Sequence, residues 1–363
     1  MKIPYRDLRV KNPALKAELL QSVDRVLSHG RTILGPEVDE FEKQVAEYCQ
    51  KKYAVGVNSG TDALYLALRC IDVGEGDEVI TTPLSWIATL NAVSLCGATP
   101  VFVDISDDLN INANLIADSI TPKTKAIVPV HFTGRMCDME QILDVAAKHG
   151  ICVVEDAAQA FGARIAGAAA GSFGDISCFS MNPMKVFCAY GDAGAIVMDD
   201  YQLCQRVKSL RYNGTVNKED CHEPSLNGRI DTVQAAMMLV ELKYLQDKID
   251  RRRKIAECYD KALKDVVICP ERDESYQIYY SYTIVAERRD ELKKYLESNG
   301  IETKIQHQIL MPFHTAYCHL PRPQIPTAER LVKQILCIPN QEDLTTEEID
   351  YIVTNIREFY GAN

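Results

Sequence analysis

The 363-residue sequence has no run of the roughly 20 apolar residues that a membrane helix needs, and segment 1–13 contains no apolar core of signal-peptide length. It also has no low-complexity tract, and its 13 cysteines include no Cys-x-x-Cys pair. A disulfide framework or a zinc knuckle would require tighter cysteine spacing. The sequence therefore predicts a cytoplasmic protein with reduced thiols and without metal or membrane contact.

Basic residues are in the minority: 40 Lys and Arg stand against 51 Asp and Glu, which gives a formal charge of −11. This balance argues against a nucleic-acid partner, because nucleic-acid-binding domains are usually basic. It leaves anionic substrates open, since a locally positive pocket can lie in an acidic protein. The hydrophobic and charged fractions, 47% and 25%, are typical of a globular protein, and the length suggests roughly two domains.

The first two-thirds of the chain alternates amphipathic patterns with short apolar runs. The expected helices are 15–27, 38–49, 62–70, 87–95 and 139–148, and the expected strands are 53–57, 78–81, 100–103, 126–130 and 151–154. Strands that alternate with helices imply a mostly parallel sheet covered on its faces. The predicted fold class is α/β.

The last third has a different pattern. A long helix is expected over 230–263, followed by a strand at 279–285, a helix at 290–298 and a second strand from Ile301. A helix from Ala328 and a last helix at 346–359 complete it. We therefore predict a large domain, 1–240, and a smaller α+β domain, 241–363, joined by the long helix.

Two segments place polar residues directly after predicted strands. In residues 57–64 a strand meets Ser59-Gly60-Thr61 at a helix start, where free backbone N–H groups can bind phosphate. Ser59 or Thr61 could equally be a plain helix cap. In residues 152–160, Asp156 follows a buried strand, where open α/β sheets bind ligands and a carboxylate can pair with a pyridinium nitrogen. An acidic helix start would explain Asp156 equally well.

Two further segments complete the set. Lys185 follows the apolar run at 178–180, and partial desolvation there favours the neutral amine that forms Schiff bases. Ser180, five residues earlier, could give a hydroxyl to a phosphate, although most lysines are solvated surface charges. Residues 225–231, with Asn227, indicate a turn and a helix start.

Together these segments resemble the DegT/DnrJ/StrS family of sugar aminotransferases, a branch of the fold-type I pyridoxal-phosphate (PLP) enzymes. The resemblance covers nearly the whole chain. It begins at residues 35–42, GPEVDEFE, continues through residues 59–61, 155–159 and Lys185, and ends at Pro339 and the acidic helix after it. It implies a large PLP-binding domain with a mostly parallel mixed sheet between helices, and a smaller C-terminal domain.

The resemblance also implies roles for residues around the cofactor ring. Lys185 matches the lysine that bonds to PLP and later moves the proton between substrate and cofactor. Asp156 matches the carboxylate that faces the pyridine nitrogen. Gln159 matches the position near the phenolic oxygen, and Trp86 takes the place of the aromatic that stacks on the ring.

The phosphate end of the cofactor has its own matches, Gly60, Thr61 and Ser180. Asn227 matches a residue that reaches the phosphate of the neighbouring subunit's cofactor. The resemblance thus implies a homodimer whose active sites are shared across the interface.

The implied reaction moves an amino group from L-glutamate to a keto or aldehyde sugar. A nucleotide-linked keto-deoxysugar for cell-surface polysaccharide or lipopolysaccharide is the leading substrate, and a non-nucleotide sugar such as an 8-oxo octulosonic acid is the second candidate. Segments 181–184 and 186–190 depart from the usual pattern, which bears on the substrate.

Two hypotheses from different functional classes compete with transamination. One is a PLP-dependent sugar dehydratase, in which histidine usually replaces the lysine, and the second is a regulatory relative that has lost catalysis. Lys185 argues against the dehydratase, and the intact set of Asp156, Ser180 and Lys185 argues against the regulatory relative.

Several residues outside these motifs are further site candidates. His131 follows a strand and could face the pocket or simply pack. Arg211, Tyr212 and Arg229 are candidates for contacting anionic substrate groups. By family analogy, Tyr5 and residues 311–317 could line the sugar site.

The remaining patterns favour no ligand. Cys221-His222 and Cys318-His319 resemble metal-ligand pairs, but no second pair stands at finger spacing. The basic run 251–254 in the long helix is expected to form a solvated face.

Overall fold

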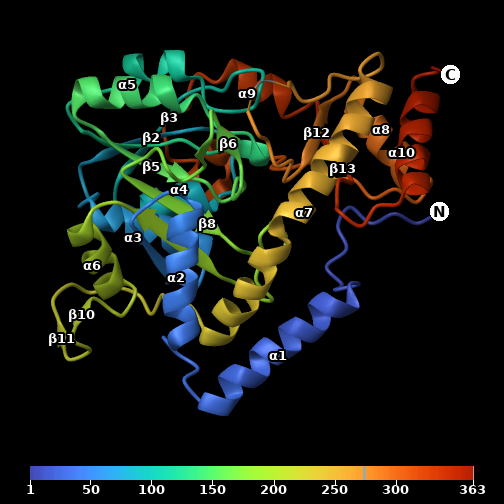
Figure 1. Cartoon of the computed structure of the whole chain (residues 1–363). Coiled ribbons are helices and arrows are strands. Elements are labelled where there is room, and N and C mark those ends of the chain that lie inside the picture. The colour runs from blue at the N-terminus through green and yellow to red at the C-terminus, as the bar shows by residue number, and fades with distance from the viewer. Residues whose placement is uncertain (273–274, 363) are drawn as a thin grey trace.

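The computed structural model describes residues 1–272 and 275–362, and its centre is a seven-stranded sheet (Figure 1). The strands lie in the order β1 (Tyr53–Val57), β9 (Gly194–Met198), β8 (Ile176–Ser180), β5 (Cys152–Asp156), β4 (Thr124–Val128), β2 (Glu78–Thr81) and β3 (Thr99–Phe102). β9 runs antiparallel to both β1 and β8, and the remaining neighbours pair in parallel. The sheet is therefore mixed and mostly parallel, as the sequence predicted.

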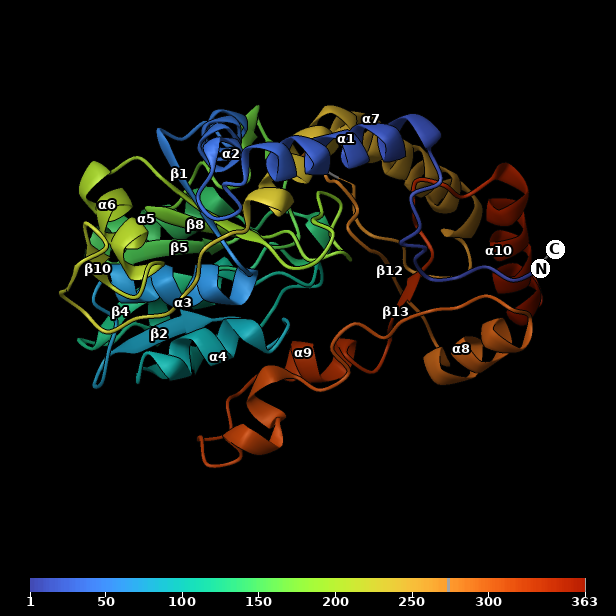
Figure 2. The ribbon, with the colours of Figure 1, turned by 90° about the horizontal axis from the view of Figure 1, so that it is seen from below.

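Helices cover both faces of this sheet (Figures 1 and 2). One face packs against α2 (Pro36–Tyr48), α5 (Met139–His149) and α7 (Thr232–Leu263), and the other against α3 (Gly60–Cys70), α4 (Ala88–Leu95) and α6 (Tyr201–Leu210). Neighbouring strand residues divide between the two faces: Ile80 lies in the first core cluster and Val79 in the second. Continuous apolar strands are what a sheet buried on both faces requires.

A smaller α+β region lies at the far end of α7 (Figure 2). It contains β12 (Tyr282–Val285) paired antiparallel with β13 (Ile335–Ile338), and the helices α8 (Arg289–Ser298) and α10 (Thr346–Phe359). Its separate core cluster also includes Ile3 from the N-terminal segment. The division of the chain into domains at 240/241, a position within α7, stays a prediction.

The other elements are peripheral. α1 (Pro13–His29) packs against α7 and begins at Asn12, whose side chain accepts hydrogen bonds from the first-turn amides. Further elements are α9 (Pro326–Leu331), several short 3-10 helices and two short strand pairs, β6 (Arg164–Ile165) with β7 (Ala168–Ala169) and β10 (Thr215–Val216) with β11 (Asp220–Cys221). Among the described residues, no helix combines the length and apolar character needed to cross a bilayer.

Two expectations about the C-terminal region were wrong. The strand expected from Ile301 does not form, because residues there make only single bridges, Ile301 to Ile3 and Lys304 to Cys337. The strand that pairs with β12 is β13. The basic run 251–254 is not simply solvated either. Arg252 is buried and paired with Glu342 at 2.6 Å, and the Arg253 guanidinium donates to the Gln277 carbonyl at 2.7 Å. Through these contacts, the run attaches α7 to the segment that precedes β12 and to the segment that follows β13.

Candidate active site

A pocket of about 380 Å³ lies at the carboxyl edge of the central sheet. Asp156 and Ser180 are the last residues of the adjacent strands β5 and β8, and α3 begins just after β1. This is the edge at which open α/β sheets bind ligands. The pocket brings together most of the site residues predicted from sequence: Gly60, Thr61, Trp86, Asp156, Gln159, Ser180 and Lys185.

One end of the pocket is a cradle between α3 and β8. Ser59 caps α3, its hydroxyl accepting the Asp62 amide at 3.0 Å, and the amides of Gly60 and Thr61, which line the pocket, have no partner within the helix. A Cβ atom on Gly60 would lie 2.5 Å from the Ser180 Cβ, and only glycine allows this approach. Backbone donors, a helix N-terminus and a serine hydroxyl are the donor set that a phosphate needs.

Asp156 lines the same pocket and is buried. Its oxygens accept hydrogen bonds from the Thr89 hydroxyl at 2.8 Å and the Ala158 amide at 3.2 Å. Burial raises the pKa of this carboxyl above its ordinary value, while Thr89, Ala158 and Lys185 act in the opposite direction. No ion pair to Asp156 occurs within residues 1–272 and 275–362. A protonated pyridine nitrogen would supply the missing positive charge, so the pocket fits both the phosphate and the ring nitrogen of PLP.

The side walls are formed by Gln159 and Trp86. The Gln159 side-chain oxygen accepts the Thr133 amide at 2.9 Å and the Gln306 side-chain amide at 3.2 Å, which leaves the Gln159 NH2 group as a donor. Trp86 is 62% exposed, and its ring centroid lies 5.8 Å from that of His307.

Residues of the small region close the pocket, and the sequence patterns did not reveal them. They are Tyr280, Lys304, Gln306 and His307, and Thr89 of α4 was missed as well. Burial and the nearby charges of Lys185 and Lys304 lower the pKa of His307 to about 3, so its imidazole is neutral. No local pattern marks these positions, because they reach the pocket only through the packing of the small region on the sheet.

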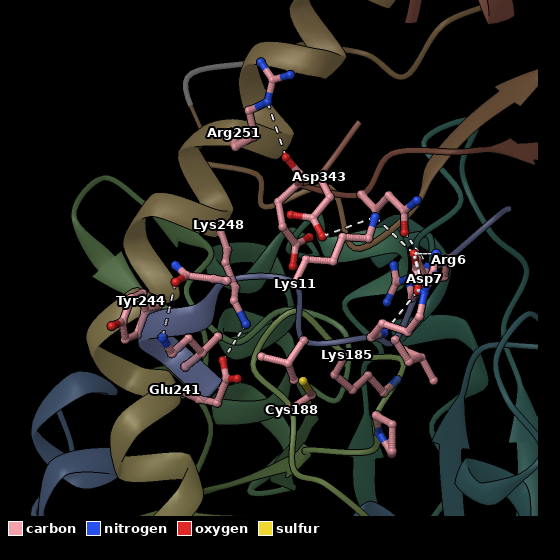
Figure 3. A pocket seen from close by; sticks show the side chains of 18 of the residues that line it. Arg6, Asp7, Lys11, Lys185, Cys188, Glu241, Tyr244, Lys248, Arg251 and Asp343 are labelled. Carbon is pink, nitrogen blue, oxygen red and sulfur yellow. Dashed lines mark hydrogen bonds and ion pairs between the residues drawn. The ribbon is translucent and has the colours of Figure 1, made fainter. Parts of the chain in front are cut away.

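Lys185 lies where this pocket meets a second cavity of about 490 Å³ (Figure 3). The second cavity lies between the N-terminal segment, α7 and residues 341–343. Its charged side chains pair largely with one another: Asp7 accepts from Lys11 at 3.0 Å, and Glu241 pairs with Lys248. The lysine can therefore be reached from two sides.

Two candidates turned out to be structural. The His131 Nδ1 accepts the Cys137 amide at 3.1 Å, so its proton is on Nε2, which donates to Glu155 at 2.9 Å; both side chains are fully buried. Arg211 is also buried and donates to Glu42 and to the Gly56 carbonyl. Neither residue lines the 380 Å³ pocket, and the expectation that Arg211 meets substrate was wrong because its charge is used in the core.

Asn227 does not line the pocket of its own chain. Its side-chain oxygen accepts from the Arg229 guanidinium at 2.7 Å, and that guanidinium lies 4.5 Å from the Tyr212 ring centroid. Tyr5 donates its backbone amide to Glu302 at 3.3 Å, and Tyr317 of the segment 311–317 donates its hydroxyl to Asn91 at 2.6 Å. The five candidates Asn227, Arg229, Tyr212, Tyr5 and Tyr317 stand outside the pocket, and their roles remain predictions.

The Cys-His pairs show no sign of a metal site. His222 pairs with Asp220 at 3.0 Å on the surface, and Cys318 is exposed. Within the described part of the chain, no group of three or more His, Cys, Asp or Glu side chains is arranged to hold an ion.

Comparison with known proteins gives the family. The sequence model of the DegT/DnrJ/EryC1/StrS aminotransferase family matches residues 13–357. A UDP-N-acetyl-3-dehydro-alpha-D-glucosamine 3-aminotransferase of Acidithiobacillus ferrooxidans is 39% identical over 98% of this chain and 97% of its own. A protein of Geobacillus stearothermophilus named "Pleiotropic regulatory protein" is 38% identical over 99% of both chains. The crystal structure of Streptomyces venezuelae DesV with a ketimine intermediate superposes with a TM-score of 0.96, at 36% identity over 100% and 99% of the two chains.

The chain belongs to the DegT/DnrJ/EryC1/StrS aminotransferase family. Solved members of similar fold contain the cofactor as pyridoxal or pyridoxamine phosphate. The protein is therefore a PLP-dependent aminotransferase, and the predicted fold-type I architecture is confirmed.

Proposed function

We propose that this aminotransferase uses Lys185 as its PLP-binding lysine and transfers an amino group from L-glutamate to a keto sugar. The observation that carries this proposal is the convergence of Lys185, Asp156 and the Gly60–Ser180 cradle on one pocket at the carboxyl edge of the sheet. The acidic residue, the lysine and the phosphate cradle come from the ends of β5, β8 and β1, with Lys185 in the loop that follows Ser180. A pocket with a purely structural origin has no need of all three.

The proposed roles follow from the contacts. The first-turn amides of α3, Thr61 and Ser180 bind the phosphate, and the NH2 group of Gln159 donates toward the ring oxygen. Asp156, fixed by Thr89 and Ala158, holds positive charge at the ring nitrogen. PLP supplies the electron sink for the substrate carbanion. Lys185 would carry the proton between the substrate carbon and the cofactor, and Trp86 would shield one face of the ring from water.

We infer that the sugar is a nucleotide-linked keto-deoxysugar that serves cell-surface polysaccharide or lipopolysaccharide synthesis. The Acidithiobacillus relative is named as a UDP-sugar aminotransferase, which supports this choice. An 8-oxo octulosonic acid is the second candidate. Lys185 in the pocket argues against a dehydratase, because the dehydratase relatives replace this lysine.

We also propose a cytoplasmic homodimer. Asn227 is exposed, Arg229 is half-buried, and the two are hydrogen-bonded to each other, so the Asn227 side chain is available to a second subunit's cofactor phosphate. Sedimentation of the holoenzyme is expected to show a dimer or a multiple of it. A stable and fully active monomer would remove the role of Asn227 in the neighbouring site.

A spectral titration tests the function. The PLP-loaded protein is treated with L-glutamate, the donor is removed, and candidate keto sugars are added one at a time. We expect glutamate to abolish the visible absorbance of the lysine-bound cofactor and one nucleotide sugar to restore it. Restoration by an octulosonate alone would favour the second candidate. No response to glutamate or any other amino donor would contradict the proposed donor reaction.

A further inference from the structure

Among the described residues, the Lys185 amine contacts an aromatic ring. The Nζ atom lies 4.6 Å from the centroid of the Tyr280 ring. Within residues 1–272 and 275–362, this amine has no hydrogen bond or ion pair. The distance is well inside the range of about 6 Å over which a cation is attracted to an aromatic face.

The Tyr280 ring is held firmly. The residue is buried, and the Arg6 guanidinium donates to its carbonyl oxygen at 2.6 Å while lying 5.0 Å from its ring centroid. Tyr279, the preceding residue, has a φ of +49°, a left-handed conformation that a non-glycine residue adopts at a cost. Figure 3 shows Arg6 and Lys185 beside the same cavity. The N-terminal segment therefore supports the ring from a part of the sequence far from both residues.

A π face suits a lysine that must both take up and release a proton. A carboxylate would hold the ammonium through a charge-assisted hydrogen bond and occupy its protons. The ring attracts the charge without a directed hydrogen bond, so the N–H groups stay available. The ring contact also restricts the rotamers that the long lysine side chain samples, which otherwise has high conformational entropy. A proton-transferring group gains rate from such orientation.

The electrostatics of Tyr280 agree with this geometry. Burial raises the pKa of its phenol, but Lys185, Arg6 and Lys304 lower it by more, so the net pKa is below the ordinary value. The cations around the ring therefore lower the pKa of Tyr280 by more than its burial raises it.

We propose that Tyr280 is a positioning residue for Lys185, whose ring face holds the amine whenever the lysine is not bonded to the cofactor, with Arg6 fixing the ring. This inference rests on the proposed function, because it takes Lys185 as the group that transfers the proton. It predicts that the aromatic ring matters and that the phenol hydroxyl does not.

The first test is spectroscopic and uses the cofactor-free protein. With lysine 13C-labelled at Cε, the Lys185 methylene signal, assigned by its loss in Lys185→Ala, is expected to be shifted upfield by the ring current of Tyr280. Tyr280→Phe should keep the shift, and Tyr280→Leu should remove it. Arg6→Met should reduce it. An unshifted Lys185 signal in the wild type would overturn the proposal without any need for a variant.

The second test is kinetic. Tyr280→Phe is expected to keep kcat within about twofold of wild type, whereas Tyr280→Leu should lower kcat about 2- to 30-fold with little change in the KM for L-glutamate. Tyr280→Met replaces the leucine variant if the latter does not fold. Equal losses in the Phe and Leu variants would refute the role of the ring and assign the effect to the hydroxyl. Full activity of Lys185→Ala would instead refute the proposed function, so the two failures are distinguishable.

Discussion

Substitution of Asp156 by asparagine should have opposite effects on the cofactor-free and the loaded protein. Asparagine keeps the shape: its oxygen can still accept the Ala158 amide, and the Thr89 hydroxyl can turn to accept from the new NH2 group. Only the charge is lost. The cofactor-free wild type buries that charge without an ion pair in the described chain, which is why its pKa is raised. We therefore expect cofactor-free Asp156→Asn to be more stable than wild type at neutral pH.

The pH dependence has a defined sign. Because the pKa of Asp156 is raised on folding, the folded protein keeps a proton that the unfolded chain has already released. The stability of the cofactor-free wild type, relative to Asp156→Asn, is therefore expected to be highest below the ordinary aspartate pKa. It should fall as the pH rises through the raised pKa and then stay lower.

With PLP bound, the order of stability should reverse, so that the wild type is more stable than Asp156→Asn. A hydrogen bond to a charged group contributes about 1.5–3 kcal/mol, which corresponds to about a 10- to 150-fold loss in PLP retention and in kcat for the variant. Thermal unfolding with and without PLP at several pH values measures both effects. The reasoning would be refuted if PLP stabilised the variant as much as the wild type, or if the cofactor-free variant were the less stable protein at neutral pH.

Three further outcomes are expected. Lys185→Ala should abolish turnover while the protein still binds PLP non-covalently, as shown by dialysis and absorbance; unchanged activity would end the assignment. Gly60→Ala should weaken PLP binding and destabilise the fold by about 1–3 kcal/mol, because the new methyl group would meet the Ser180 Cβ at 2.5 Å; wild-type affinity and melting temperature would contradict the cradle. Glu155→Gln should lose about 1–3 kcal/mol of stability in denaturant unfolding, because its NH2 group would face N–H and O–H groups that now donate to the carboxylate, among them the Gly171 amide at 2.9 Å and the His131 Nε2 at 2.9 Å. Burial opposes ionisation of Glu155, but His131 and backbone amides lower its pKa overall, so this stabilisation is present above the ordinary glutamate pKa and lost as the pH falls through the lowered one. A difference between variant and wild type that did not shrink in acid would count against this.

The sequence predicted the bounds of an element correctly where residues within or next to that element mark its ends. The strands β1 and β2 and the helix α10 match the predicted ranges residue for residue, because apolar runs end at turn residues or at the capping pair of Thr345 and Glu348. The expected strand from Ile301 failed for the opposite reason. The partner of β12 lies some fifty residues further along the chain, and nothing local in β13 identifies it.

The sequence by itself determined the α/β class and the wall of the pocket to which we assign the cofactor. Asp156, Ser180 and Gly60 stand at strand ends, Lys185 lies in the loop that follows Ser180, and parallel strands bring such ends to one edge. Only the tertiary structure decided what faces that wall. Tyr280 and His307 reach the pocket because the small region packs against the sheet, and Arg6 contacts Tyr280 from the N-terminal segment. Arg211 does not reach the site, because it is buried and hydrogen-bonded to Glu42. Contacts between distant segments depend on how elements pack, and no local period or motif encodes that packing.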